Sequence, residues 1–238
     1  MYVTHPVPDG FRVLDSASAP APPEDVLARV RQLWEEELAQ RPGLFNGRLF
    51  SLEAMHGGEA RGFMAEYMWY VAQLRAPELR EHLRVRSLAV SGLVTAGGHV
   101  LFGLRKNSLA IEGGLWELAP SGTIHGGHRE PGGAISWREH FLEELREELG
   151  IEAAAAKATA FALVEDTETG IWELGVSVEI PLDHRDVLAA WANLPRSEHS
   201  ELAAVPVADV PRFHTLRKAH MVGACGPLLR ASGLLPGA

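Results

Sequence analysis

The hydrophobic and polar positions between residues 136 and 151 repeat with the period of an α-helix. At about 100° per residue the apolar side chains share one arc. They are Trp137, Phe141, Leu142, Leu145 and Leu149. Ser136 and Glu139 have the spacing of a capping box, and Gly150 is a C-terminal stop signal. The pattern therefore predicts one amphipathic helix with two defined ends.

A second arc of the same helix is acidic. Glu144, Glu147 and Glu148 lie at positions i, i+3 and i+4. Glu144 and Glu148 repel each other, and the group lies toward the negative end of the helix dipole. A bound cation would relieve this conflict, and rigid oxygen ligands suit Mg²⁺ or Mn²⁺. A solvated acidic face, with Arg146 paired to its neighbours, is the other interpretation that these residues leave open.

The chain before residue 84 is expected to be an irregular lead-in and then a small helix and strand layer. Residues 1–22 hold four prolines and small residues, which is typical of irregular structure. The pattern then predicts a helix over 23–40, strands over 48–55 and 62–74, and a short helix over 76–83. The aromatic residues Tyr67, Trp69 and Tyr70 favour the second strand.

The remaining chain alternates between strands and helices. Strands are predicted over 84–95, 99–105, 115–120, 158–165, 172–180 and 201–207, with helices over 186–194 and 213–231. This order predicts an α+β or α/β sandwich and not a repeat protein. We divide the chain into the lead-in 1–22, an N-terminal helix and strand extension 23–83, and a principal domain 84–238.

Charge and cysteine content exclude several classes of function. Lys plus Arg number 22 and Asp plus Glu number 31, so the net charge of −9 argues against nucleic acid as a partner. Cys225 is the only cysteine, which excludes an intrachain disulfide and a thiolate metal cluster. No stretch has the length and apolarity of a membrane span. We expect a cytoplasmic protein with no membrane partner; the aromatic strand around Tyr67 leaves a homodimer open.

The acidic helix resembles part of the sequence signature of the Nudix hydrolase family. The family box is G-x5-E-x7-R-E-U-x-E-E-x-G-U, where U is a bulky aliphatic residue. Glu144-Leu145, Glu147-Glu148 and Gly150-Ile151 match its second half residue for residue. Upstream, 116–122 resembles the family's strand and glycine turn, and downstream 197–202 resembles its acidic segment. The resemblance covers residues 84–215 and implies a Nudix-like α/β/α sandwich with a mixed sheet.

The first half of the box departs from the family pattern. The glycine, loop glutamate and arginine positions hold Arg129, Ile135 and Glu143. Gly122 can serve as the box glycine only if the loop carries seven extra residues. In the family the arginine orients the paired glutamates, so here that task falls to Arg138 or Arg146, or is left undone. A subfamily with altered geometry and a pseudoenzyme both remain open.

The resemblance implies a reaction and a set of residues. The reaction is metal-dependent hydrolysis of a diphosphate bond in a nucleoside diphosphate linked to another moiety, X. Glu144, Glu147 and Glu148 would be the metal ligands for Mg²⁺ or Mn²⁺. A carboxylate outside the helix would be the general base, with Glu201 the first candidate and Glu198 the second. The substrate would be a small-molecule diphosphate, and the segment 44–47 favours a nucleotide sugar.

Basic residues outside the helix are candidates for substrate binding. Arg105 and Lys106 end a strand, and either could bind a terminal phosphate or be an ordinary surface charge. His125 and His128 lie in a loop rich in glycine and histidine and are expected substrate contacts. Their spacing can hold a metal, but the sequence nearby offers no evident third ligand. His140, one turn before Glu144, could lie behind the glutamates or on the surface.

Two other classes of function compete with the hydrolase. A Nudix-like module that lacks the family arginine and loop glutamate could sense a nucleotide without cutting it. An isomerase of the isopentenyl diphosphate type on the same fold would need a reactive cysteine near the substrate. Cys225 lies in the predicted closing helix, where it suits an apolar filler, so we rank the isomerase last.

Overall fold

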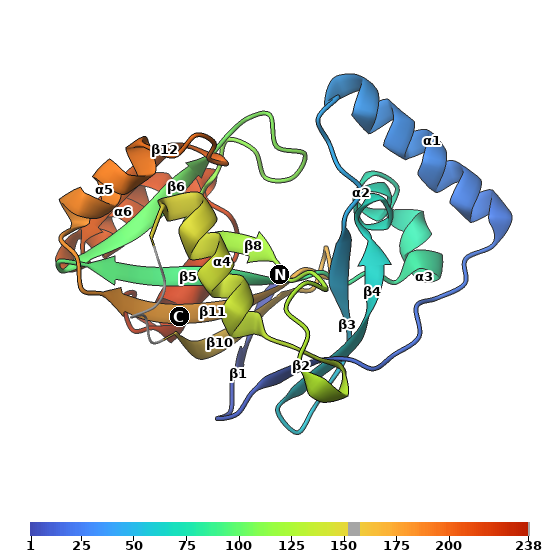
Figure 1. The fold of residues 1–238 in the computed structure, drawn as a ribbon, viewed down its shortest axis with the longest axis horizontal. Coiled ribbons are helices and arrows are strands. Elements are labelled where there is room, and N and C mark those ends of the chain that lie inside the picture. Colours follow the sequence, from blue (N-terminus) through green and yellow to red (C-terminus); the bar gives the residue numbers. More distant parts are fainter. Residues whose placement is uncertain (152–157, 238) are drawn as a thin grey trace.

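The larger of two sheets is mixed. The computed structural model describes residues 1–151 and 158–237. In this sheet the strand order is β1-β10-β11-β5-β6-β12, with β7 paired to β6 and β8 paired to β5 (Figure 1). The strands are β1 (Tyr2–Pro6), β5 (Leu88–Ala96), β6 (His99–Arg105), β7 (Trp116–Leu118), β8 (Ser121–Thr123), β10 (Thr159–Asp166), β11 (Trp172–Ile180) and β12 (His199–Pro206). β11 and β5 run parallel, whereas the other pairs are antiparallel.

Helices cover both faces of the larger sheet. They are α4 (Trp137–Leu149) and α5 (His184–Ala192) on one face, and α6 (Val210–Arg217) and α7 (Cys225–Ala231) on the other. Because side chains alternate along a strand, Val90 and Val94 of β5 pack in the core with α4, while Leu93 packs in the core with α7. The predicted α/β/α sandwich with a mixed sheet is confirmed.

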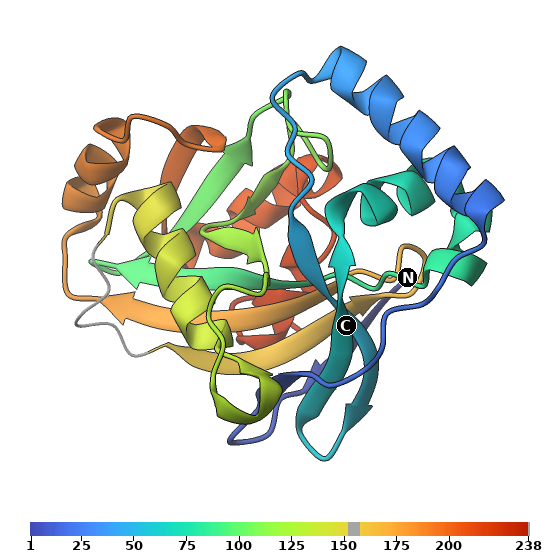
Figure 2. The ribbon, with the colours of Figure 1, turned by 45° about the vertical axis from the view of Figure 1, so that its right-hand side comes forward.

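The smaller sheet carries the N-terminal helices. Its order is β3-β4-β2-β9, formed by β3 (Arg48–His56), β4 (Glu59–Glu66), β2 (Arg12–Asp15) and β9 (Ala134–Ile135). The helices α1 (Glu24–Gln40), α2 (Tyr67–Arg75) and α3 (Arg80–Leu83) lie beside β3 and β4 (Figure 2). Their apolar residues form one cluster with Leu49 and Phe63 of that sheet. The 3₁₀ turns of the chain are Pro77–Leu79, Pro131–Gly133, Val207–Asp209 and Lys218–His220.

The irregular lead-in was a wrong prediction. Residues 1–22 contain β1, which pairs with β10, and β2, which pairs with β4 and β9. The partner strand of β1 lies about 160 residues further along the chain, so local proline content could not reveal the pairing. A strand stabilised by a distant partner leaves little signal in its own residues.

Two element types also differ from expectation. Residues 67–74 form α2 and not a strand, because the loop before β3 supplies acceptors for the helix start: Tyr67 N donates to Gly47 O and Met68 N to Asn46 Oδ1, at 2.8 and 2.9 Å. The closing helix is broken into α6, a 3₁₀ turn and α7, with Met221 extended between them. The break leaves Val222 N free to donate to Trp116 O at 2.8 Å.

Cys225 is buried in α7, as expected for an apolar filler. Among the described residues, every helix is too short or too polar to cross a bilayer.

Candidate functional site

A cavity of about 1380 Å³ lies between the two sheets. One wall comes from the N-terminal extension, including Tyr67 and Tyr70 of α2. The opposite wall comes from the larger sheet and α4. Its ionisable residues are Arg105, Glu112, Glu117, His125, Arg129, Glu144, Glu173 and Glu198. The site is therefore built jointly by the extension and the principal domain.

α4 brings two of the predicted metal ligands against the turn at β8. Glu148 is buried and its Oε2 accepts a hydrogen bond from the Ser121 amide at 3.0 Å. The Glu144 carboxylate lies against Gly122, at a position where a Cβ atom would overlap it. A glycine at 122 is thus required for the carboxylate to reach the cavity wall.

The environment of these two carboxylates disfavours negative charge. Burial, followed by the charges of Glu198 and Glu147, raises the pKa of Glu144 to about 8. Burial, followed by the charges of Glu117 and Glu144, raises the pKa of Glu148 well above its ordinary value. A divalent cation would reverse this balance. The oxygen donors and the space kept by Gly122 fit Mg²⁺ or Mn²⁺.

A buried ion-pair network adjoins the glutamates. Glu117 on β7 accepts from Arg105 Nη1 at 3.0 and 2.8 Å, and its Oε1 lies 2.8 Å from His199 Nε2. Burial lowers the pKa of Arg105, but the adjacent Glu117 outweighs it and the net shift is upward. Glu117, Glu148 and His199 each place a ligand atom within 4.8 Å of the others.

Glu117 and His199 are site residues that the sequence reasoning missed. Glu117 is a charged residue between Trp116 and Leu118 in a fully buried strand, which was the one available signal. His199 packs its ring on Gly103 of β6. The two come from β7 and β12, which lie on either side of β6, so only the sheet order brings them together.

The other predicted residues divide into cavity residues and surface residues. Glu198 and Arg105 line the cavity. Glu147 and Glu201 are exposed, and Lys106 is exposed with its Nζ donating to Ser197 O at 2.6 Å. The structure thus brings Glu144, Glu148 and Glu198 together and leaves Glu147 and Glu201 outside this group.

Glu143, at the family arginine position, lies among histidines. Its Oε2 is 3.1 Å from His125 Nε2 and 2.8 Å from His128 Nε2. Arg146 lies 4.0 Å from Glu143, while Arg138 donates to the Ala158 carbonyl. Within the described residues neither arginine pairs with Glu144 or Glu148. For Glu148 the Ser121 amide supplies an orienting bond instead.

A second acidic pair faces the cavity away from α4. Ser91 Oγ donates to Glu173 of β11, and burial raises the pKa of Glu173 to about 8. Burial also raises the pKa of Glu112 to about 7. Both carboxyl groups therefore favour the protonated form more than an exposed glutamate does.

Comparisons with known proteins find similarity at the level of structure alone. No family model matches the sequence. No curated protein matches it either. Among solved structures, DR0079 from Deinococcus radiodurans has a TM-score of 0.49 and 14% identity, over 77% of this chain and 98% of that one.

Two further solved structures contain Nudix-type domains. A bifunctional NMN adenylyltransferase/ADP ribose pyrophosphatase from Francisella tularensis, complexed with AMP and a Mn ion, has a TM-score of 0.44 and 16% identity. The matched region covers 68% of this chain and 45% of the Francisella tularensis chain. The NUDIX domain of Shewanella oneidensis NrtR, complexed with ADP ribose, has a TM-score of 0.39 and 16% identity, over 63% and 87% of the two chains. All three TM-scores lie below 0.5 and all three identities are 16% or less, so these similarities say nothing about the activity of this chain.

Proposed function

We propose that this chain hydrolyses a diphosphate bond in a nucleoside diphosphate linked to another moiety, and that it requires Mg²⁺ or Mn²⁺. The observation that carries the proposal is the placement of Glu144 and Glu148. Both project from one helix: Glu144 lines a large cavity and Glu148 is buried one turn further along, in surroundings that make their negative charge costly. A bound cation would compensate the negative charge of these carboxylates, and a negatively charged substrate would bind to that cation.

Glu144 and Glu148 would hold the metal. When bound, a divalent ion neutralises phosphoryl oxygens and lowers the pKa of a coordinated water. Glu147 belongs to the family's ligand set, but it is exposed here, so the proposal rests on the other two glutamates.

Glu198 is the preferred general base. Both Glu198 and Glu201, our first candidate from the sequence, are exposed, but only Glu198 lines the cavity. A general base must reach the proton that it removes. We therefore choose it by its place in the cavity and not by its similarity to the family sequence. The proposed role is to take a proton from the attacking water.

The phosphate contacts are proposed from the same cavity. Arg105 is held in place by Glu117, which fixes its guanidinium but also compensates its charge. His125 lines the cavity and stays a candidate contact, while Lys106 and His128 are proposed only as outlying contacts. Arg129 also lines the cavity and would add positive charge near a phosphate.

A nucleotide sugar is the narrower form of the proposal. Glu112 and Glu173, whose carboxyl groups favour the protonated form, would exchange hydrogen bonds with hydroxyl groups and offer a phosphate no positive charge. A substrate with phosphates at α4 and a polyhydroxyl X group at Glu173 would match both regions.

The test is phosphate release from a panel of nucleotide sugars, ADP-ribose, dinucleotides and isoprenyl diphosphates in a phosphatase-coupled assay. We expect cleavage of at least one member with Mg²⁺ or Mn²⁺ and none after chelation. Glu148→Gln should lower the rate at least about 100-fold, because it removes a ligand charge. Glu139→Gln, an exposed position on the same helix, is the matched control and should retain the rate.

The second candidate function is nucleotide sensing without hydrolysis. The histidine-bound Glu143 at the arginine position and the exposed Glu147 favour it. If no panel member is cleaved but one raises the melting temperature, this second function replaces the first. Full activity of Glu148→Gln would remove Glu148 from the proposed metal site.

A further inference from the structure

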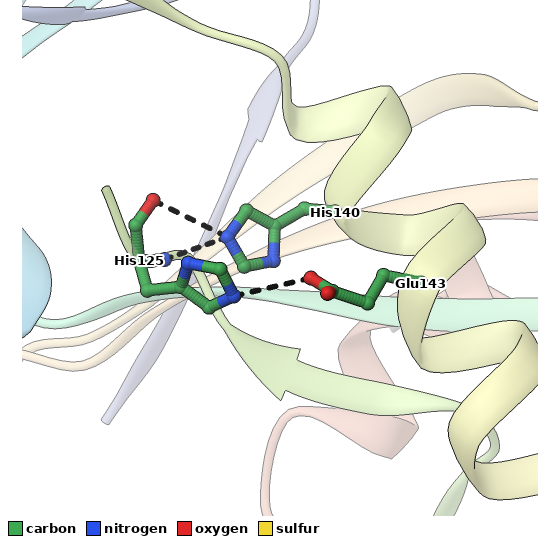
Figure 3. Close-up of side chains that lie close together, drawn as sticks. All are labelled: His125, His140 and Glu143. Carbon is green, nitrogen blue, oxygen red and sulfur yellow. Dashed lines mark hydrogen bonds and ion pairs between the residues drawn. The ribbon is translucent and has the colours of Figure 1, made fainter. Parts of the chain in front are cut away.

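Three histidines and one glutamate gather where the loop after β8 meets α4. Glu143 Oε2 lies 3.1 Å from His125 Nε2 and 2.8 Å from His128 Nε2 (Figure 3). The His140 ring lies edge-on to both, with centroid distances of 3.9 Å to His125 and 5.2 Å to His128. Four side chains that commonly bind metals thus converge from two segments.

His140 carries the feature that the remaining contacts do not explain. Its side chain is 0% exposed, and within the described residues its Nδ1 is a buried atom with no hydrogen-bond partner. Its Nε2 accepts from the His125 amide at 2.8 Å, so a neutral ring carries its proton on Nδ1. In Figure 3 this second ring nitrogen points toward the Glu143 carboxylate. Leaving such a buried donor unpaired is unfavourable, because its lost hydrogen bond to water is not replaced.

The other tautomer of His140 would remove this cost if a metal were bound. Its Nδ1 would then offer a lone pair to the ion, and its Nε2–H would donate to the His125 carbonyl oxygen, 3.3 Å away. A metal-binding histidine that donates its second ring N–H to a backbone carbonyl is a recurring arrangement. The backbone of residue 125 therefore offers a partner to either tautomer.

We propose that His125, His128, His140 and Glu143 form a site for a divalent transition metal of the zinc class. Imidazole nitrogens with one carboxylate suit Zn²⁺ and Co²⁺, whereas Mg²⁺ prefers oxygen ligands. His125, His140 and Glu143 each place a ligand atom within 4.8 Å of the others, and His128 supplies a fourth donor. Four donors fill a tetrahedral shell, which is typical of a structural site. The site shares only His125 and the outlying His128 with the contacts proposed for hydrolysis, and it does not depend on that reaction.

Binding requires a defined rearrangement of protons. The Gly127 amide now donates to His125 Nδ1 at 2.9 Å, so His125 Nε2 carries the proton that faces Glu143. For Nε2 to bind the ion, the proton must sit on Nδ1 and the Gly127 amide must turn away. His128 Nε2 likewise gives up its proton. Metal binding is therefore coupled to a turn of the backbone at Gly126 and Gly127.

An ion-pair cluster without metal accounts for only part of the geometry. It explains why His125 and His128 both face Glu143, because two imidazoles can donate to one carboxylate. It leaves His140 Nδ1 unpaired in the interior. A bound ion explains all four side chains.

A metal here would fix the loop that forms part of the cavity wall. His125 and Gly126 line the cavity, and the loop continues to Ser136, which starts α4. Crosslinking the loop to the helix through His140 and Glu143 would hold this wall in one conformation.

The test uses the full chain, stripped with a chelator and titrated with Co²⁺ and, by competition, with Zn²⁺. We expect one equivalent of Co²⁺ with the visible absorption of a tetrahedral ion. His128→Ala and Glu143→Gln, both at partly exposed positions, should weaken binding at least about tenfold. His82→Ala and Glu139→Gln are exposed, lie outside the cluster and should bind as the natural chain does.

A double variant separates this site from the glutamates of the cavity. Glu144→Gln with Glu148→Gln should keep the tetrahedral spectrum and Zn²⁺ affinity even if all hydrolysis is lost. The proposal is overturned if the natural chain gives no tetrahedral spectrum, or if His128→Ala and Glu143→Gln bind as tightly as it does. It is equally overturned if the double variant alone loses the spectrum, because the ion would then sit on the cavity glutamates.

Discussion

The glutamates of α4 show how position on a helix sets the chemistry of a side chain. Glu143 pairs with two histidines, and this contact outweighs burial and lowers its pKa. Glu144, next in the chain, faces the cavity, where burial raises its pKa to about 8. Glu147 is exposed and Glu148 is buried. Successive side chains of a helix are turned by about 100° from one another, so neighbouring glutamates of α4 face different surroundings and have different contacts.

Glu173 gives a pH-dependent prediction at the residue scale. Burial raises its pKa from 4.5 to about 8, so between these values the folded chain holds a proton that the unfolded chain has lost. The free energy of unfolding therefore falls as pH rises through this window. Glu173→Gln removes the ionisation, and we expect it to stabilise the chain by about 2–4 kcal/mol at pH 8 and much less near pH 5. Urea unfolding at several pH values measures this difference.

Glu179→Gln is the matched control for that experiment. It lies on the same strand but is exposed, so its effect on stability should be small at every pH. The prediction fails if the effect of Glu173→Gln is the same at pH 5 as at pH 8 and no larger than that of Glu179→Gln. Glu173 would then not hold a proton in the folded chain.

At the scale of the element, α4 is fixed at both ends. Ser136 Oγ accepts from the Glu139 amide at 3.4 Å, while the Ser136 amide donates to His128 O at 2.8 Å. The predicted capping box is therefore half-formed, because the loop carbonyl replaces the Glu139 side chain as acceptor. At the other end Gly150 adopts φ 71°, which favours glycine.

Ser136→Ala should lower the free energy of unfolding by about 1 kcal/mol, because it removes a helix cap. Ser136→Asp keeps an oxygen acceptor and adds a negative charge at the positive end of the helix dipole, so it should retain most of the stability. Urea unfolding of the three chains measures the difference. Equal stability of the alanine and aspartate variants would mean that the hydroxyl contributes no cap.

Elements with local signals were predictable from the sequence. α4 has a period of 3.6, a cap residue and a stop glycine, and β11 was predicted with its observed bounds. α2 was mistaken for a strand because Tyr67, Trp69 and Tyr70 favour strands locally, whereas the helix starts on hydrogen bonds from the 46–47 loop. β1 and β2 were missed because distant strands stabilise them.

The residues of the candidate site likewise divide into those with a local sequence signal and those brought together by distant parts of the chain. Glu144 and Glu148 could be predicted because helix spacing alone puts them near each other. Glu117 and His199 could not, because they meet across β6 through the order of the strands. For the same reason the sequence analysis ranked Glu201 above Glu198, although only Glu198 lines the cavity.

At the scale of the whole molecule, the extension and the principal domain share one core. Phe50 and Leu52 of β3 belong to the same buried cluster as Val90 and Leu145. Backbone bonds also cross the boundary: Phe50 N donates to Ile124 O at 2.7 Å. The division at residue 83 stays a prediction, and this packing leads us to expect that the two parts unfold together.

Phe50→Ala tests that expectation. Phe50 is 0% exposed, so its loss should cost about 3–5 kcal/mol. If the molecule is one cooperative unit, this loss of stability affects the extension and the principal domain equally. Peptides from β4 and β11 should then show the same lowered urea midpoint in pulsed hydrogen exchange. Phe141→Ala, in the same core but on α4, should move both midpoints in the same way. A shift of the β4 midpoint with an unchanged β11 midpoint would instead make the extension an independent unit, and the cavity between them an interface between two folding units.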